Sequence, residues 1–457
     1  MIGSMRLKSS AVILAAALAL AGCSTISNVG STVGKLNPFA SKKPQEASDA
    51  SESQRISIVA FDQKVEANEN LKGQDFFLPA AAAQADWPVP GGTAEQSVEN
   101  IDAAPAFQVA WRRGFGKGSG RQLHVTAPPV MADGRIYVMD AEATVVAIDA
   151  RSGGVLWKTN LKPKSKRDKL GFGGGVAYAD GKLYVASGFR FVAQLDAATG
   201  KLGWRTATES PIHGAPNVAG GRVFVISTDN ELLVYDVTSG NSIWDYQALI
   251  EPARILGASS PAVSGDAVVG AFASGELVAL RTSNGNQLWN TTLAKASRSN
   301  ALSEIRDVAG RPVIYKGDVY AASHSGVFAA TDLRSGNARW TLAVASTDTP
   351  WPAGDVVFVT STAGEVVCAS RETGQVYWVR DLNQGLKKKK RSIWTGPILV
   401  NDRLILVSDK GQALALDPKS GVTKASLKVG AGVLIAPIAA NGMIYLVNDK
   451  AELVAIR

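Results

Sequence analysis

The histidines are the first residues whose chemistry has to be weighed, because imidazole serves both as a metal ligand and as a general base. His124, His213 and His324 lie far apart in the sequence, and no HxH or HxxxH spacing joins any two of them. A zinc site made from neighbouring ligands is therefore not predicted. The chain also lacks a Gly-x-Ser-x-Gly elbow, which argues against an α/β-hydrolase serine. We expect the histidines to occupy loop or core positions.

A glycine-rich segment, GFGGG at residues 171–175, could suggest a phosphate-binding loop. It lacks the Lys and Ser/Thr that follow the glycines of such a loop, and it leads into a strand-like run where a helix would be needed. The segment is better explained as a turn that enters a strand.

The two cysteines predict different roles. Cys368 lies in an apolar, strand-like run at residues 365–370, where a free thiol behaves as a small hydrophobic side chain. Cys23 ends the sequence LAGC, which follows a short apolar stretch at residues 11–20 and looks like a bacterial lipobox. A disulfide framework is therefore not expected.

This N-terminal pattern predicts that residues 1–22 are a lipoprotein signal peptide and that Cys23 is the lipidated first residue of the mature chain. Ser24 follows the cysteine where an aspartate would be the alternative, which by resemblance to Gram-negative lipoproteins implies transfer to the outer membrane. We expect the chain to be held by its lipid in the inner leaflet of that membrane and to face the periplasm.

Composition divides the rest of the chain. Residues 23–54 are rich in Ser, Ala, Lys, Asn and Pro and predict a flexible tether. Residues 55–105 regain apolar clusters and are expected to pack on the outside of the domain that follows, which spans residues 106–457. The 46% hydrophobic content and 45 glycines fit a turn-rich β protein.

The formal charge of +8 comes partly from two basic runs, at residues 162–169 and 386–391. Each run falls between repeats and is expected to be a solvated loop. Contact with anionic lipid head groups or with an acidic partner is the alternative. Nucleic acid is not an expected partner of a secreted chain.

One repeat organises residues 106–457: a turn with Gly or Asp, a short strand, a second turn, a second strand, and then a glycine followed four residues later by tryptophan. Its spacing is roughly 40 to 50 residues, as expected for four-stranded propeller blades. We expect each ring to wedge between neighbouring blades. The tryptophans assigned to this structural role are Trp111, Trp157, Trp204, Trp244, Trp289, Trp340 and Trp378.

The count of repeats predicts how the ring closes. Six Gly/Trp copies and a seventh at Gly421, where Ala425 takes the tryptophan position, leave an eighth unit at residues 435–457 without its last strand. The orphan strand at residues 106–111 can supply it and remove an open edge. The predicted fold is therefore all-β, an eight-bladed β-propeller closed by an N-terminal strand in the last blade.

The repeat, most complete in LDAATGK at residues 195–201, resembles the quinoprotein-type repeat. That family includes pyrroloquinoline-quinone dehydrogenases and BamB-like scaffolds. The dehydrogenases hold the quinone against a disulfide between adjacent cysteines and bind calcium, yet no two cysteines are adjacent here, and a haem attachment motif is missing. We expect no cofactor, no metal and no catalytic residue, and so a protein that is not an enzyme.

The resemblance to BamB covers residues 107–457 and the lipobox. It implies a monomeric scaffold within the BAM complex that binds BamA and other subunits and assists outer-membrane protein folding and insertion, with unfolded outer-membrane proteins as further candidate partners. The matching BamA-binding loops are residues 251–257 and 303–308. Their expected contacts are Arg254, Ile255, Leu256 and Asp307.

Three alternatives stay open from sequence alone. Ile255 and Leu256 could simply cap a blade interface. The propeller could instead bind a glycan or a peptide in its central channel, or be a degenerate quinoprotein dehydrogenase. In addition, the family's second acidic position in the later loop falls on Ala309, and the extension at residues 55–92 departs from the shorter members of the family.

Overall fold

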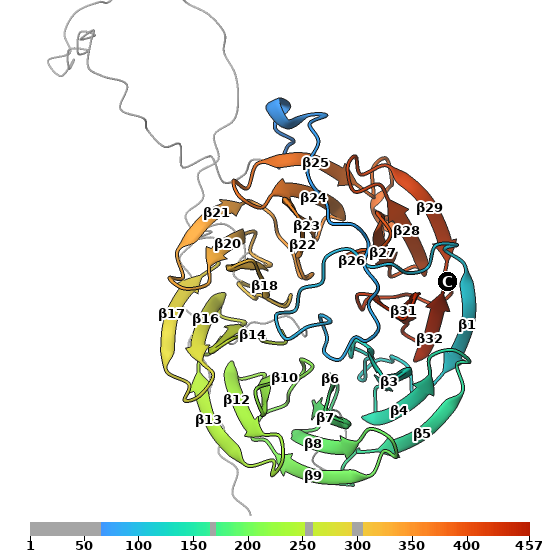
Figure 1. Cartoon of the computed structure of the whole chain (residues 1–457), viewed down its shortest axis with the longest axis vertical. Coiled ribbons are helices and arrows are strands. Elements are labelled where there is room, and N and C mark those ends of the chain that lie inside the picture. Colours follow the sequence, from blue (N-terminus) through green and yellow to red (C-terminus); the bar gives the residue numbers. More distant parts are fainter. Residues whose placement is uncertain (1–64, 165–170, 252–258, 295–304) are drawn as a thin grey trace, which may run out of the picture. The chain divides into compact units, whose positions relative to one another are not determined.

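Short antiparallel strands arranged as blades around a ring account for nearly all regular structure in the computed structural model (Figure 1), which describes residues 65–164, 171–251, 259–294 and 305–457. The described strands form eight four-stranded sheets. In each blade the first strand lies nearest the centre of the ring and the fourth lies on the rim. The predicted eight-bladed propeller is confirmed.

The blades are numbered from the N-terminal side, and their strands run from the centre outward. Blade 1 contains β2 (Val130–Ala132), β3 (Arg135–Met139), β4 (Thr144–Asp149) and β5 (Val155–Asn160). Blade 2 contains β6 (Gly174–Ala179), β7 (Lys182–Ser187), β8 (Phe191–Asp196) and β9 (Leu202–Ala207). Blade 3 contains β10 (Asn217–Ala219), β11 (Arg222–Ile226), β12 (Glu231–Asp236) and β13 (Ser242–Gln247). Blade 4 contains β14 (Ala262–Ser264), β15 (Ala267–Ala271), β16 (Glu276–Arg281) and β17 (Gln287–Thr292).

The second half of the ring follows the same plan. Blade 5 contains β18 (Val313–Tyr315), β19 (Asp318–Ala322), β20 (Phe328–Asp332) and β21 (Ala338–Leu342). Blade 6 contains β22 (Trp351–Ala353), β23 (Val356–Thr360), β24 (Glu365–Ser370) and β25 (Val376–Asp381). Blade 7 contains β26 (Trp394–Leu399), β27 (Leu404–Ser408), β28 (Gln412–Leu416) and β29 (Thr423–Lys428). Blade 8 contains β30 (Ile438–Ala440), β31 (Met443–Val447), β32 (Glu452–Ile456) and β1 (Val109–Gly114).

Two single-turn 3-10 helices, η2 (Glu69–Leu71) and η5 (Lys388–Lys390), complete the described elements. No helix within the described ranges combines the length and apolar character needed to cross a membrane.

Burial explains the amino-acid pattern of the strands. Middle strands such as β27 are buried along their whole length, because both faces of a blade are covered by neighbouring blades. Rim strands such as β5 alternate exposed and half-buried residues, because only one of their faces meets the next blade. The turn between the first two strands of blade 1 places Asp133 and Gly134 at φ 52° and 70°, as a two-residue type I′ hairpin requires.

Strand β1 closes the ring as expected. It pairs antiparallel with β32, with Trp111 opposite Ala455 and Gly114 opposite Glu452. Beyond the strands, the backbone N–H of Gln108 donates to the carbonyl of Arg457 at 3.1 Å, and the N–H of Arg457 donates back at 2.8 Å. The outer strand of blade 8 therefore comes from the N-terminal side of the propeller, and no edge is left open there.

The seams between blades follow one rule. In six of them the indole N–H of the rim tryptophan donates to a main-chain carbonyl of the next blade at 2.7 to 3.1 Å. The same ring lies on the glycine of the next blade's turn, where an added Cβ would come within 2.5 to 2.9 Å of the indole; the pairs are Trp111/Gly153, Trp157/Gly200, Trp204/Gly240, Trp244/Gly285, Trp289/Gly336, Trp340/Gly374 and Trp378/Gly421. Glycine is thus required for two reasons: its φ is near +70°, and a side chain at this position would collide with the tryptophan ring of the preceding blade.

Ala425 stands where the seventh copy lacks its tryptophan. A tryptophan at this position would have to pack on the glycine of the turn before the last strand of blade 8. Blade 8 has no such turn, because its last strand is β1, and the hydrogen bonds between Gln108 and Arg457 take the place of the turn. Ala425 packs instead against the apolar cluster that contains Phe107. The missing tryptophan therefore marks the seam at which the ring is closed.

Residues 75–104, the cover segment, cross the middle of the ring (Figure 1). Hydrogen bonds join this irregular segment to all eight blades, mostly at the first strand or the turn after it; the blade partners are Met131, Tyr178, Asn217, Val263, Ile314, Asp355, Asn401 and Gly442. Trp87, 1% exposed, stacks on Trp351 of blade 6 with ring centroids 6.5 Å apart. The centre of this face, the covered face, is therefore occupied by protein.

Candidate functional site

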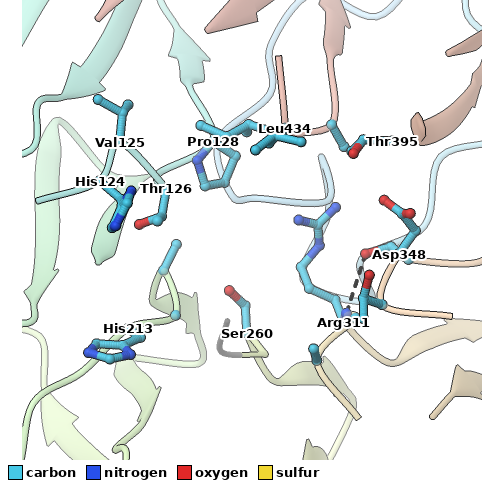
Figure 2. A pocket seen from close by; sticks show the side chains of 18 of the residues that line it. His124, Val125, Thr126, Pro128, His213, Ser260, Arg311, Asp348, Thr395 and Leu434 are labelled. Carbon is cyan, nitrogen blue, oxygen red and sulfur yellow. Dashed lines mark hydrogen bonds between the residues drawn. The ribbon is translucent and has the colours of Figure 1, made fainter. Parts of the chain in front are cut away.

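The opposite face, the open face, carries the turns between second and third strands and the loops that connect one blade to the next. A central pocket of about 430 Å³ opens where the first strands of all eight blades begin (Figure 2). Its labelled lining comprises His124, Val125, Thr126, Pro128, His213, Ser260, Arg311, Asp348, Thr395 and Leu434. Because every blade, together with the segment that leads into it, contributes between one and five lining residues, the pocket is formed by the ring as a whole and not by any local motif.

Arg311 and Asp348 dominate the electrostatics of the pocket. Burial lowers the pKa of Arg311 to about 10, and the charge of Asp348 opposes that shift. Burial raises the pKa of Asp348 to about 7, opposed by the backbone N–H of Gly396 and by the charge of Arg311. The Nε of Arg311 has no hydrogen-bond partner among the described residues. At neutral pH the positive charge of Arg311 is therefore only partly neutralised by Asp348.

Two of the three histidines meet in this pocket. Phe172 of the glycine-rich segment lies between them, stacked on His213 at 4.6 Å and edge-on to His124 at 5.5 Å between ring centroids. His324 lies apart, in blade 5, where its backbone N–H donates to the carbonyl of Asp307 at 2.9 Å. Across the described ranges, no three His, Cys, Asp or Glu side chains gather as a metal site would require.

The pocket does not fit a quinone held against a disulfide with calcium beside it. Cys368, the cysteine within the described part of the chain, is fully buried in β24 and does not line the pocket. No Phe, Tyr or Trp is among the lining residues, and the lining carboxylates Asp348 and Asp449 come from different blades. The arrangement can attract an anion, but the described residues offer no cradle for quinone chemistry.

Of the four predicted partner contacts, one lies within the described residues. Arg254, Ile255 and Leu256 lie outside the described residues. Asp307 is described and is only 3% exposed. A charged contact through Asp307 therefore stays a prediction, and its burial fits a role in holding the loop.

Sequence reasoning missed Leu249 and Ile250, which lead into the first of these loops. They are 68% and 73% exposed, although the strand before them ends in a regular pattern. The residue types of this pair are those of a core dipeptide, and the only sequence signal that could have distinguished it is its position directly after a rim strand.

Two hydrogen bonds hold the backbone of Leu249. The backbone N–H of Leu249 donates to Glu276 at 2.8 Å, and its carbonyl accepts from the side chain of Asn230 at 2.6 Å. Glu276 and Asn230 are 5% and 3% exposed. Asn230 also lines a small crevice together with Asp307, so the support of Leu249 and the described end of the later predicted loop lie at one place between blades 3 and 4. We name Leu249 and Ile250 the rim pair.

The fold and the open face define a class of protein: a quinoprotein-like propeller whose pocket does not fit the quinone and whose inter-blade loops lie on the same face as that pocket. The family model for "Outer membrane protein assembly factor BamB" matches residues 94–168, 141–380 and 383–457. The chain belongs to this family, as the repeat and the lipobox predicted.

Individual proteins agree with this assignment. The outer membrane protein assembly factor BamB of Burkholderia pseudomallei is 27% identical over 351 residues, covering 75% of this chain and 86% of the relative. BamB of Salmonella typhimurium is 26% identical over 389 residues, covering 76% and 88%. The crystal structure of BamB from Moraxella catarrhalis superposes with a TM-score of 0.66 at 21% identity, covering 76% of this chain and 99% of that one.

Dehydrogenases share the fold alone. Quinohemoprotein alcohol dehydrogenase from Comamonas testosteroni superposes with a TM-score of 0.58 at 17% identity, covering 80% of this chain and 77% of that one.

Proposed function

We propose that this chain is a non-catalytic scaffold of the outer-membrane β-barrel assembly machinery. Its relatives carry the name of an outer membrane protein assembly factor. The pocket of this chain does not fit quinone chemistry, while its inter-blade loops remain available for binding. In this proposal the propeller binds the periplasmic domains of BamA and assists the folding and insertion of outer-membrane proteins.

The rim pair is the observation that carries the proposal. Two adjacent large aliphatic side chains, each exposed to more than two thirds, form an apolar patch that a partner can cover, and buried Asn230 and Glu276 hold the backbone of Leu249. Preorganised apolar side chains lose little entropy on binding and act as anchors of an interface. Ile255 and Leu256, the residues first expected to bind, lie outside the described residues and remain part of the proposal.

Co-purification with BamA from solubilised outer membranes tests this surface. The double variant Leu249→Asp and Ile250→Asp should recover at least tenfold less BamA, since charge is placed where apolar area is to be buried. Stability should change by no more than about 0.5 kcal/mol, because both positions are exposed.

Val422→Asp supplies the matched control, because Val422 is 58% exposed on the covered face of blade 7. It should leave BamA recovery unchanged. Undiminished recovery with the double variant would remove this surface from the proposal.

Attachment through a lipid at Cys23 is part of the same proposal. Cys23→Ser should move the protein from the membrane pellet to the soluble periplasmic fraction, because the lipid is the proposed anchor. A variant that stays in the pellet after high-salt washing would show that another element holds it there.

A further inference from the structure

The loop between β25 and β26 concentrates positive charge on the open face. Residues 387–391 are four lysines and an arginine in succession, and every one of them is exposed. No acidic residue occurs between Leu382 and Trp394. None of the five cations forms an ion pair within the described residues. The run is therefore free to meet an external anionic surface.

Two aliphatic side chains flank the cations. Leu386 is 41% exposed and Ile393 is 61% exposed. An apolar residue on each side of a lysine run does not help solubility, but it matches an interface in which charge meets head groups and short apolar stems reach below them.

The loop is built as a fixed platform. Asn383, 3% exposed, joins its two ends: the side chain donates to the carbonyl of Ser392 at 3.0 Å and accepts from the N–H of Ser392 at 2.9 Å. The N–H of Ile393 donates to Asp409 at 3.0 Å. Lys410 donates to the carbonyls of Lys390 and Arg391, which adds a sixth cation beneath the run.

We propose that residues 386–393, the basic loop, bind an anionic phospholipid bilayer. Four of the five consecutive cations are lysines, whose compact charges suit a diffuse charged plane, whereas recognition of individual carboxylates favours the forked guanidinium of arginine. Lysine is also depleted in protein interfaces. Each lysine near an anionic membrane strengthens binding by roughly fivefold, so the loop as a whole is a substantial membrane contact.

A fluorophore on the loop tests the proposal in the full chain. Gln384 is exposed, so Gln384→Cys provides a labelling site beside Leu386. Cys368 is fully buried and does not compete for label, and the parent chain reports any labelling at Cys23. An environment-sensitive dye at position 384 should shift to shorter wavelength with vesicles of phosphatidylcholine and phosphatidylglycerol, and not with phosphatidylcholine alone.

The matched control lies on the same blade but on the covered face. Glu372 is exposed in the turn between β24 and β25, and dye at Glu372→Cys should not shift with either vesicle. Replacing Lys387, Lys388, Lys389 and Lys390 with Gln in the Gln384→Cys chain should abolish the shift, and high salt should weaken it in the parent sequence.

Three results would overturn the proposal: no shift with anionic vesicles, an equal shift with neutral vesicles, or an equal shift at position 372. The first would leave an acidic protein surface as the partner of the loop. BamA recovery is measured separately, so a failure of the membrane-binding proposal can be distinguished from a failure of the proposed BamA contact at the rim pair.

Discussion

The covered face and the open face of the same ring satisfy their polar and apolar groups in different ways. On the covered face, residues 75–104 supply hydrogen bonds to every blade, and Trp87 is almost completely buried. On the open face, the rim pair is exposed, and the Nε of Arg311 has no hydrogen-bond partner in the described part of the chain. The groups of the covered face are therefore satisfied by contacts within the chain, while the open face keeps exposed apolar and unpaired polar groups that a partner could contact.

Trp87→Ala should produce the largest effect, because it removes a buried indole and its stacking on Trp351. We expect a loss of about 3–5 kcal/mol in the free energy of unfolding, measured by denaturant titration. Ile393→Ala, at an exposed position of the open face, should change it by less than about 0.5 kcal/mol. Equal losses from the two variants would erase the distinction between the faces.

Asp348 tests the open face through pH. Its folded pKa of about 7 lies above the value of an unfolded aspartate, so the folded state holds the extra proton between those two values. The free energy of unfolding should therefore fall by up to about 4 kcal/mol as pH rises from about 4 to about 7, and then level off.

Asp348→Asn removes this ionisation. The variant should gain stability relative to the parent at about pH 8 but not at about pH 4, as measured by denaturant titration at both values. A constant difference between the two proteins would show that Asp348 does not titrate in this range.

Asn230→Ala should have a smaller effect, confined to the base of the rim pair. It leaves the carbonyl of Leu249 and the N–H of Ala273 without their partner, at a cost of about 1–3 kcal/mol. BamA recovery should fall as well, because the backbone of Leu249 loses this support. Asn230→Asp keeps the acceptor for Ala273 and should fall between the parent and the alanine variant in stability; full recovery of BamA with Asn230→Ala would mean that this support is dispensable.

The ring was predictable because each blade repeats the same local chemistry. Gly, Trp and β-branched positions recur often enough to count blades and to assign the closing strand, although β1 begins at Val109, three residues later than the expected Ala106. The seating of Trp157 on Gly200 was not foreseen, because it joins positions of adjacent repeats that look independent in sequence.

The sites were harder to predict for the same reason. Arg311 and Asp348 face one pocket from two blades, and no spacing in the sequence encodes that meeting. The cover segment binds largely through backbone groups, which leave no periodic pattern. Leu249 and Ile250 have ordinary core chemistry, and only their exposure distinguishes them.

The cover segment also changes how the ring should come apart. Repeat proteins whose units touch only their neighbours can lose terminal units one at a time. Here a single stretch of chain is bonded to all eight units, so releasing any one of them disturbs a strand of backbone shared by the others. The propeller, already closed into a ring by the pairing of β1 with β32, should therefore unfold as one cooperative body, and its amide protons should exchange from all blades in a single global opening.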